Sequence, residues 1–279
     1  MSRIEKALEK AAQLRNRSVS EEVREEIREP GVVVPEAFAA DQPPTITSPY
    51  LVTVQDPHCP ISEEYRKLKS LIVRTTREKF LNTIMVTSTC KGEGKTITAL
   101  NLAISLAQEF DHTVLLVDAD LRQPSVTRYL GIQAEPGLSD CLSNGRDVGD
   151  ALVKTGIGKM VVLPAGKAMA NPVELLSSGR MKQLVHELKN RYRDRYIIID
   201  TPPILHFAEA HAIGSCVDGV VFVVGEGQAP ISDVKESMRM LKDCQMLGVV
   251  YNNVASARFT EGYNYRYHYK YYHKASEGY

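Results

Sequence analysis

The stretch IMVTSTCKGEGKTITALNLAISLAQ, residues 84–108, decides the fold. It opens with apolar and β-branched residues, passes through a loop that contains two glycines, and continues with apolar residues at helical spacing. A glycine-rich loop between a strand and a helix presents backbone N–H groups at the N-terminus of the helix, where they bind anions. The stretch therefore predicts a phosphate-binding loop at residues 89–96.

The residue types in this loop suit a nucleotide. Gly92 and Gly94 let the backbone approach a phosphate closely. Lys95 can reach the outer phosphates, and Thr96 offers a hydroxyl group to Mg²⁺. Position 89 is Thr, whereas the usual GxxxxGK[ST] pattern begins with Gly, so a structural turn is the alternative. The strand, loop and helix context favours the nucleotide site.

The rest of the chain repeats the alternation of strand and helix. Helix-like segments lie between most of a series of short apolar, β-branched runs at residues 82–88, 112–120, 159–166, 195–203, 218–225 and 246–254. This alternation predicts an α/β fold with a mostly parallel, doubly wound sheet and helices on both faces. We expect three regions: an N-terminal helix and linker, a P-loop domain and a tail, at residues 1–57, 58–260 and 261–279.

Three carboxylates follow two of the predicted strands. VLLVDADLR places Asp118 and Asp120 at the end of one strand, and YIIIDTPP places Asp200 at the end of another. A single carboxylate at such a position is often only the N-cap of the next helix. Three of them beside a GKT loop indicate a Mg²⁺ site, because Mg²⁺ prefers oxygen ligands and keeps several waters.

Composition limits the other possibilities. Lys plus Arg equals Asp plus Glu, at 34 each, so the chain has no general attraction for nucleic acid. The five cysteines are scattered without metal-ligand spacing, which is typical of a reduced, cytoplasmic protein. The sequence begins without an apolar signal core, and its apolar runs are too short to span a bilayer.

The C-terminal tail has an unusual composition. Seven of its nineteen residues are tyrosines, out of thirteen in the chain: Tyr263, Tyr265, Tyr267, Tyr269, Tyr271, Tyr272 and Tyr279. A tail of tyrosines and basic residues could bind RNA or polysaccharide by stacking. Beside a nucleotide site, we expect instead that these tyrosines are phosphate acceptors.

GEGKT, LLVDADLR, IIIDTPP and the terminal tyrosine cluster together resemble the bacterial tyrosine kinases, a family related to the MinD/ParA-like P-loop ATPases. The resemblance covers about residues 58–279 and includes LPAGKAMANPVELLSS (163–178) and GVVYNNV (248–254). The N-terminal MSRIEKALEKA is similar to the start of tyrosine autokinases encoded with exopolysaccharide loci. The resemblance implies an ATP-dependent protein-tyrosine kinase.

The resemblance also implies a role for each matching residue. Lys95 would hold the β- and γ-phosphates, and Asp118 would accept the proton of the incoming tyrosine hydroxyl group. The Mg²⁺ would be held, directly or through water, by Thr96, Asp120 and Asp200. The nucleotide would be bound by Lys91, Gly92, Glu93, Gly94, Lys95, Thr96 and Asn252, the last of them near the adenine.

A further motif of the family concerns self-association. Glu63, Arg66 and Lys69 match its ExxRxxR pattern, with Lys in place of the last Arg. Lys keeps the charge but loses the bidentate geometry of Arg, which weakens the implied contact. The resemblance implies a ring-like homo-oligomer in which one copy phosphorylates the tail of another.

The implied cofactors are ATP and Mg²⁺. The implied partners are a separate membrane-anchored activator of chain-length-regulator type, which would recruit the cytoplasmic chain to the inner face of the membrane, and a cognate tyrosine phosphatase. The implied role is regulation of exopolysaccharide biosynthesis or export. The main alternative is a MinD/ParA-like switch ATPase without kinase activity. A scaffold that binds ATP and presents the tail is a third possibility.

Overall fold

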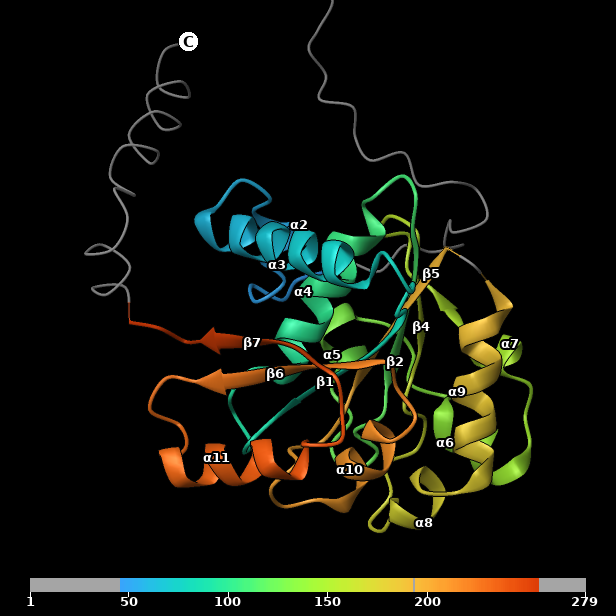
Figure 1. Ribbon diagram of the computed structural model, residues 1–279. Helices are drawn as coiled ribbons and strands as arrows, with labels where there is room; N and C mark the ends of the chain where they lie inside the picture. Colours follow the sequence, from blue (N-terminus) through green and yellow to red (C-terminus); the bar gives the residue numbers. More distant parts are fainter. Residues whose placement is uncertain (1–45, 193, 256–279) are drawn as a thin grey trace, which may run out of the picture. The chain divides into compact units, whose positions relative to one another are not determined.

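The computed structural model describes residues 46–192 and 194–255 (Figure 1). The elements follow one another as α2 (Val52–Gln55), α3 (Pro60–Thr76), β1 (Thr83–Ser88), α4 (Lys95–Ala107), β2 (Thr113–Asp118), α5 (Val126–Leu130), α6 (Leu138–Asn144), α7 (Val148–Ala151), β3 (Val153–Lys154), β4 (Met160–Leu163), α8 (Val173–Leu176), α9 (Gly179–Arg191), β5 (Arg195–Asp200), α10 (Ala208–Gly214), β6 (Gly219–Gly225), α11 (Ile231–Met240) and β7 (Met246–Asn252).

The strands form one seven-stranded sheet in the order β3-β4-β2-β5-β1-β6-β7. Six of them run parallel, and the two-residue β3 pairs antiparallel with β4 at one edge. Asp118, the last residue of β2, lies beside Asp200, the last residue of β5. The carboxyl ends of parallel strands meet at one edge of a sheet, which is where such folds bind ligands.

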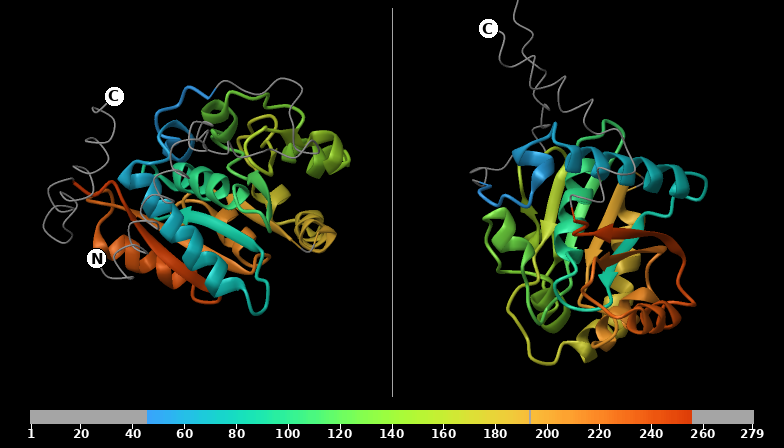
Figure 2. Two further views of the ribbon diagram at one scale, coloured as in Figure 1. Left: turned by 90° about the horizontal axis from the view of Figure 1, so that it is seen from above. Right: turned by 90° about the vertical axis from the view of Figure 1, so that its left-hand side faces the viewer.

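Helices cover both faces of the sheet (Figures 1 and 2). Alternate residues of each central strand join different cores, because successive side chains of a strand point to opposite faces. Ile84 of β1 joins the core beneath α3 and α4, whereas Met85 joins the core beneath α9 and α10. Burial on both faces explains why the central strands are continuous apolar runs in the sequence.

The sequence-based fold class is confirmed. Each of the six predicted runs contains a strand of the sheet, and four of the strands end before the runs do. The run 195–203 was expected to continue through two prolines, but β5 ends at Asp200 because proline lacks the N–H group that a central strand needs. The short helices α5 to α8 and the edge strand β3 were not predicted.

The packed part of the chain begins earlier than residue 58, where the sequence analysis placed the domain boundary. Leu51 is fully buried, and Thr53 donates hydrogen bonds from both its backbone N–H and its hydroxyl group to the Asn101 side chain on α4. Asn101 in turn donates to the Tyr50 carbonyl oxygen. The expected N-terminal helix and the tail at residues 261–279 lie outside the described residues.

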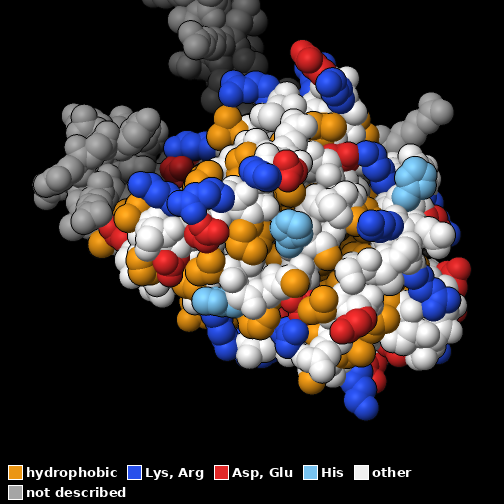
Figure 3. Space-filling view, turned by 60° about the horizontal axis from the view of Figure 1, so that its bottom comes forward, with side chains coloured by type: hydrophobic (Ala, Val, Ile, Leu, Met, Phe, Trp, Pro, Cys, Tyr) orange, Lys and Arg blue, Asp and Glu red, His pale blue; other side chains and the backbone are white. Residues whose placement is uncertain are grey.

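Among residues 46–192 and 194–255, none of the helices has both the length and the apolar character that crossing a bilayer requires. On the face that carries α8, α10 and α11, acidic and basic side chains are interspersed (Figure 3). This mixture agrees with the equal numbers of acidic and basic residues in the sequence.

Asp218 joins the start of β1 to the start of β6. Its Oδ2 accepts hydrogen bonds from the backbone N–H groups of Asn82 and Thr83 and from the Thr83 hydroxyl group, and Lys189 pairs with its Oδ1. Burial alone would raise the pKa of Asp218, but the hydrogen bonds from Lys189 and Thr83 outweigh burial and hold the pKa below its ordinary value.

Replacing this carboxylate should therefore destabilise the fold. We expect Asp218→Asn to lower the free energy of unfolding at pH 7 by about 2 kcal/mol, since hydrogen bonds to a charged group are lost. Because the folded-state pKa is lowered, the stabilisation is present above the unfolded pKa and disappears as the pH falls below about 4. Urea unfolding at several pH values measures both effects.

The exposed Asp243→Asn is the matched control and should leave the stability unchanged. A loss in Asp218→Asn that stays constant down to pH 3 would contradict the assignment of the effect to the Asp218 charge.

Candidate active site

The loop between β1 and α4 has the conformation of a phosphate cradle. Gly92 and Gly94 have φ angles of 94° and 90°, in the left-handed region that favours glycine. A Cβ atom at Gly94 would lie 2.0 Å from the Asn252 side-chain nitrogen, so the loop and the end of β7 approach as closely as glycine permits. Lys95 and Thr96 open the first turn of α4. The loop therefore directs backbone N–H groups toward an anion at the helix N-terminus.

Glu93 holds this loop from inside the protein. Its side chain is fully buried, and its carboxylate accepts hydrogen bonds from the N–H groups of Cys90 at 2.7 Å and Gly225 at 3.2 Å. The Asn252 side chain donates to the Glu93 carbonyl oxygen at 2.9 Å. Glu93 thus connects the loop to the ends of β6 and β7. Glu93 was predicted to be a nucleotide-binding residue from its position in the loop, and its side chain supports the loop from inside the protein.

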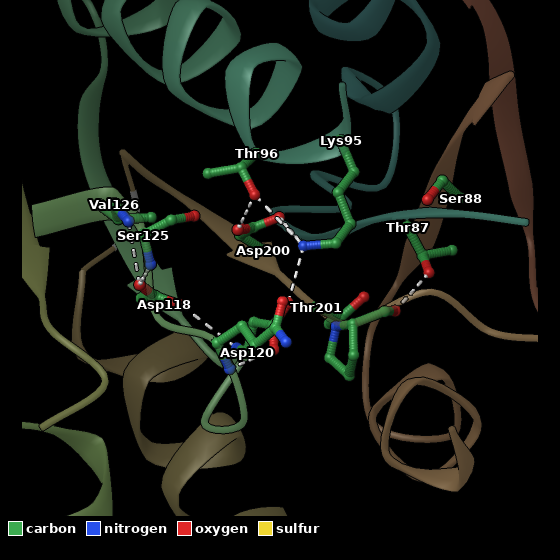
Figure 4. Close-up of polar contacts among 12 residues, drawn as sticks. Thr87, Ser88, Lys95, Thr96, Asp118, Asp120, Ser125, Val126, Asp200 and Thr201 are labelled. Atoms are coloured by element: carbon green, nitrogen blue, oxygen red, sulfur yellow. Dashed lines mark hydrogen bonds and ion pairs between the residues drawn. The ribbon is translucent and has the colours of Figure 1, made fainter. Parts of the chain in front are cut away.

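Lys95 and Thr96 meet two of the predicted carboxylates (Figure 4). The Lys95 ammonium group donates to Asp120 Oδ2 at 2.9 Å and lies 3.6 Å from Asp200 Oδ1. The Thr96 hydroxyl group donates to Asp200 Oδ2 at 2.7 Å. Residues from α4, β5 and the loop after β2 therefore converge at the carboxyl end of the sheet, as the strand-end pattern predicted.

The charged side chains of this group shift one another's pKa values. Burial lowers the pKa of Lys95, but the attraction of Asp200 and Asp120 outweighs burial, and the net shift is upward. Burial raises the pKa of Asp200 despite the nearby Lys95 and the Thr96 hydroxyl group. The ammonium group consequently stays protonated, which is the state that binds phosphate.

Asp118 faces away from this group. It is fully buried, its Oδ1 accepts from the Asp120 N–H at 3.2 Å, and its Oδ2 accepts from the N–H groups of Ser125 and Val126 at 3.2 and 3.1 Å (Figure 4). Burial and the nearby Asp200 raise the pKa of Asp118 to about 7. In this conformation Asp118 positions the start of α5, a contact that the sequence did not predict.

The site can accommodate Mg²⁺ once phosphates are present. Asp200 Oδ1 is buried without a hydrogen-bond partner, and Thr96, Asp120 and Asp200 are hard oxygen donors of the kind that Mg²⁺ prefers. Within the described residues, no three His, Cys, Asp or Glu side chains form a ready-made metal cluster. The residues therefore fit a metal that takes part of its coordination from phosphate and water.

A cleft of about 1120 Å³ opens above the strand ends. Lys91, in the loop after β1, lines this cleft. The lining also includes Asn252 at the end of β7 and Arg122, Arg128 and Tyr129, which follow β2. Because β1 and β5 lie between these strands, the cleft crosses the sheet with Lys95 and Thr96 in its middle. This shape can hold a nucleotide on one side of the loop and a second reactant on the other.

The predicted self-association residues form contacts within the chain. On α3, Arg66 pairs with Glu63 at 2.9 Å and donates to the Pro57 carbonyl oxygen, and Lys69 pairs with Glu109 at the end of α4. Their role between copies stays a prediction. The seven tail tyrosines lie outside the described residues.

Comparison with known proteins identifies the family. Residues 81–246 match the family model described as AAA domain. The chain is 34% identical to the tyrosine-protein kinase YwqD of Bacillus subtilis, over 76% of this chain and 89% of that protein. The chain belongs to the bacterial tyrosine-protein kinase family. The expected enzyme class, protein-tyrosine kinase, is thereby confirmed.

Other relatives and solved structures agree with this membership. The kinase is 34% identical to the tyrosine-protein kinase CpsD of Streptococcus agalactiae, over 64% of this chain and 78% of that protein. Its structure resembles the chimerical protein CapA2B2 (TM-score 0.69, 31% identity, 74% of this chain and 91% of that one). It also resembles the kinase domain of Escherichia coli ETK (TM-score 0.69, 28% identity, 77% and 85%). The MinD of Pyrococcus horikoshii, solved with Mg-ADP, shares the fold at 24% identity and TM-score 0.52, over 61% of this chain and 69% of that one.

Glu93→Gln tests the buried support of the loop. The amide can accept only one of the two N–H groups that the carboxylate accepts, so we expect the loop to loosen and ATP to bind about tenfold more weakly. Fluorescence titration with a labelled ATP analogue measures this affinity. The exposed Glu174→Gln should bind like the unaltered chain, and equal affinities in both variants would show that Glu93 does not support the site.

Proposed function

We propose that this kinase is an ATP-dependent autokinase that phosphorylates its own C-terminal tyrosine cluster in trans. The observation that carries the proposal is the arrangement of Lys95, Thr96 and Asp120 in the cleft, in contact with the buried Asp200, in a chain that belongs to the tyrosine-protein kinase family. The seven tyrosines of the tail, Tyr263 to Tyr279, supply acceptors within the same chain.

The chain's own residues suit phosphoryl transfer, which depends on positioning and on charge neutralisation. In the proposed reaction the bond from the γ-phosphorus to the bridging oxygen breaks, a bond to the tyrosine oxygen forms, and ADP leaves. The N–H groups of the loop and the Lys95 ammonium group would hold the phosphates, with Asn252 beside the adenine. Bound Mg²⁺, held by Thr96, Asp120 and Asp200, would supply further neutralisation of phosphate charge.

The proton of the tyrosine hydroxyl group requires an acceptor. We assign this role to Asp118, as the sequence analysis did, because a base with a pKa near neutrality is best suited to accept a proton at neutral pH. In the described conformation its oxygens accept N–H groups of Asp120, Ser125 and Val126. Catalysis therefore requires the segment that begins α5 to release Asp118 when the acceptor binds.

Tethering explains why the acceptors form a cluster at the end of the chain. The tail of nineteen residues reaches at most about 63 to 68 Å, which is enough to enter the cleft of a neighbouring copy. A tethered acceptor has a high effective concentration. Each phosphorylated tyrosine adds a charge of about −1.5 to −2, so successive phosphates would weaken the contacts between copies. Glu63, Arg66 and Lys69 are the proposed contacts in a ring-like assembly.

The proposed role is regulation of exopolysaccharide or capsule biosynthesis and export. A separate membrane-anchored activator of chain-length-regulator type would recruit the cytoplasmic kinase to the inner face of the membrane, and a cognate tyrosine phosphatase would reverse the modification. The similarity to tyrosine-protein kinases such as CpsD supports this role.

Intact-mass and peptide mass spectrometry after incubation with Mg-ATP test the kinase proposal. We expect several additions of phosphate, all of them on tail tyrosines, and none in Lys95→Met, because the phosphates lose their cationic contact. Lys167→Met, which removes an exposed lysine, is the control and should be modified normally.

Modification that persists when all seven tail tyrosines are changed to Phe would contradict the proposed acceptors. ATP hydrolysis without any phosphotyrosine, even with the cytosolic segment of an activator, would favour the switch ATPase.

Asp118→Asn tests the proposed base. Loss of a general base lowers kcat by about 10²-fold or more. Affinity for ATP should change little, because Asp118 does not line the cleft. Asp120→Asn should instead weaken metal-dependent nucleotide binding, and Asp243→Asn should change neither value. An Asp118→Asn kinase with an unaltered kcat would exclude Asp118 as the base.

A further inference from the structure

The cationic side chains of the cleft are not equally neutralised. Lys95 is paired with Asp120 and Asp200, and Arg122 is paired with the buried Glu209 at 2.6 Å. Within the described residues, neither Lys91 nor Arg128 takes part in an ion pair. Lys91 belongs to the phosphate-binding loop. The cation left without an assigned anion is therefore Arg128 on α5.

Arg128 lies on the side of the cleft where an acceptor would enter. The phosphate loop follows β1, whereas α5 follows β2, which is two strands away across β5. Neighbouring strands lie about 4.8 Å apart, so α5 begins roughly 10 Å from the loop across the sheet. Asn252, on the opposite side, belongs to the adenine end of the proposed site. An acceptor that attacks in line from the far side of the γ-phosphate would approach from the side of α5.

The exposed Arg128 guanidinium group lies over an aromatic surface. Arg128 lies over the Tyr129 ring at 5.2 Å from its centroid, and the exposed Tyr50 meets the same ring edge to face at 6.4 Å. All three side chains line the cleft. A guanidinium group over a partly buried aromatic ring, with a second, exposed ring nearby, is suited to a phosphate monoester on an aromatic ring.

The sequence of the tail shows which ligand of that class the chain itself can provide. Between Tyr263 and Tyr271 every second residue is a tyrosine, and the residues between them are Asn264, Arg266, His268 and Lys270. This stretch offers no anion to Arg128 until one of its tyrosines carries phosphate. In an extended chain residues two apart point to the same side and lie about 7 Å apart, so a phosphotyrosine can bind beside the next acceptor.

We propose that Arg128, with Tyr129 and Tyr50, forms a phosphotyrosine subsite that binds an already modified tail tyrosine while the tyrosine two positions away is phosphorylated. This inference rests on the proposed autokinase function and adds a substrate preference to it. A singly phosphorylated tail is a better substrate than an unmodified tail.

Binding of synthetic tail peptides tests the subsite without any turnover. A labelled peptide of residues 261–279 with phosphate on Tyr267 should bind the dephosphorylated, nucleotide-free kinase about tenfold more tightly than the unmodified peptide, as measured by fluorescence anisotropy. The preference should disappear in Arg128→Gln and persist in Arg239→Gln, which removes an exposed arginine of α11. Equal affinities for the two peptides, or a preference that survives in Arg128→Gln, would overturn the subsite.

A time course of intact mass in Mg-ATP gives the second result. In Arg128→Gln the rate of the later phosphates relative to the rate of the first should fall about tenfold below the same ratio in the unaltered kinase. Identical mass distributions in both proteins would overturn the subsite. If the kinase adds no phosphate at all but still prefers the phosphopeptide through Arg128, the autokinase function is refuted and the subsite stands.

Discussion

The site depends on one cation that compensates for buried carboxylates. Parallel pairing of β2 with β5 brings Asp118 beside Asp200 in the interior, and Asp120 follows two residues later. Burying unpaired charges in this way is costly. Lys95 offsets the cost for Asp120 and Asp200, and backbone N–H groups offset it for Asp118. The same lysine is the proposed contact to the phosphates, so the charge that stabilises the site is also the charge that binds the ligand.

Much of the fold could be predicted from the sequence. Central strands that are buried on both faces appear in the sequence as continuous apolar runs. The loop between β1 and α4 carries its glycines and lysine in a short, recognisable motif. The short elements could not be predicted. β3 has only two residues, and helices such as α7 and α8 have four, which is too few for a periodic pattern. The segment before residue 58 is polar and rich in proline, yet Leu51 is buried through contacts that its own sequence does not specify.

The sequence predicted which residues form the site, but it did not predict how all of their side chains are oriented. The pattern of the sequence identified Lys95, Thr96, Asp120 and Asp200, and the structure brings these four together. The inward turn of Glu93 depends on an N–H group of Gly225, more than 130 residues away, and the orientation of Asp118 depends on the start of α5. Such contacts with the backbone of distant segments leave no signature in a motif. The sequence did not identify Arg128 as a site residue for a related reason. Arg128 and the phosphate-binding loop line the same cleft, but no sequence motif contains both of them.

We propose that one copy of this kinase phosphorylates the tail of another. The most direct measurement mixes a Lys95→Met copy that keeps its tail with a copy that keeps Lys95 and has all seven tail tyrosines changed to Phe, and follows each by intact mass in Mg-ATP. Transfer in trans predicts phosphate on the Lys95→Met copy alone, and only in the mixture. Phosphate that fails to appear on that copy, while the unaltered kinase does modify itself, would contradict transfer in trans.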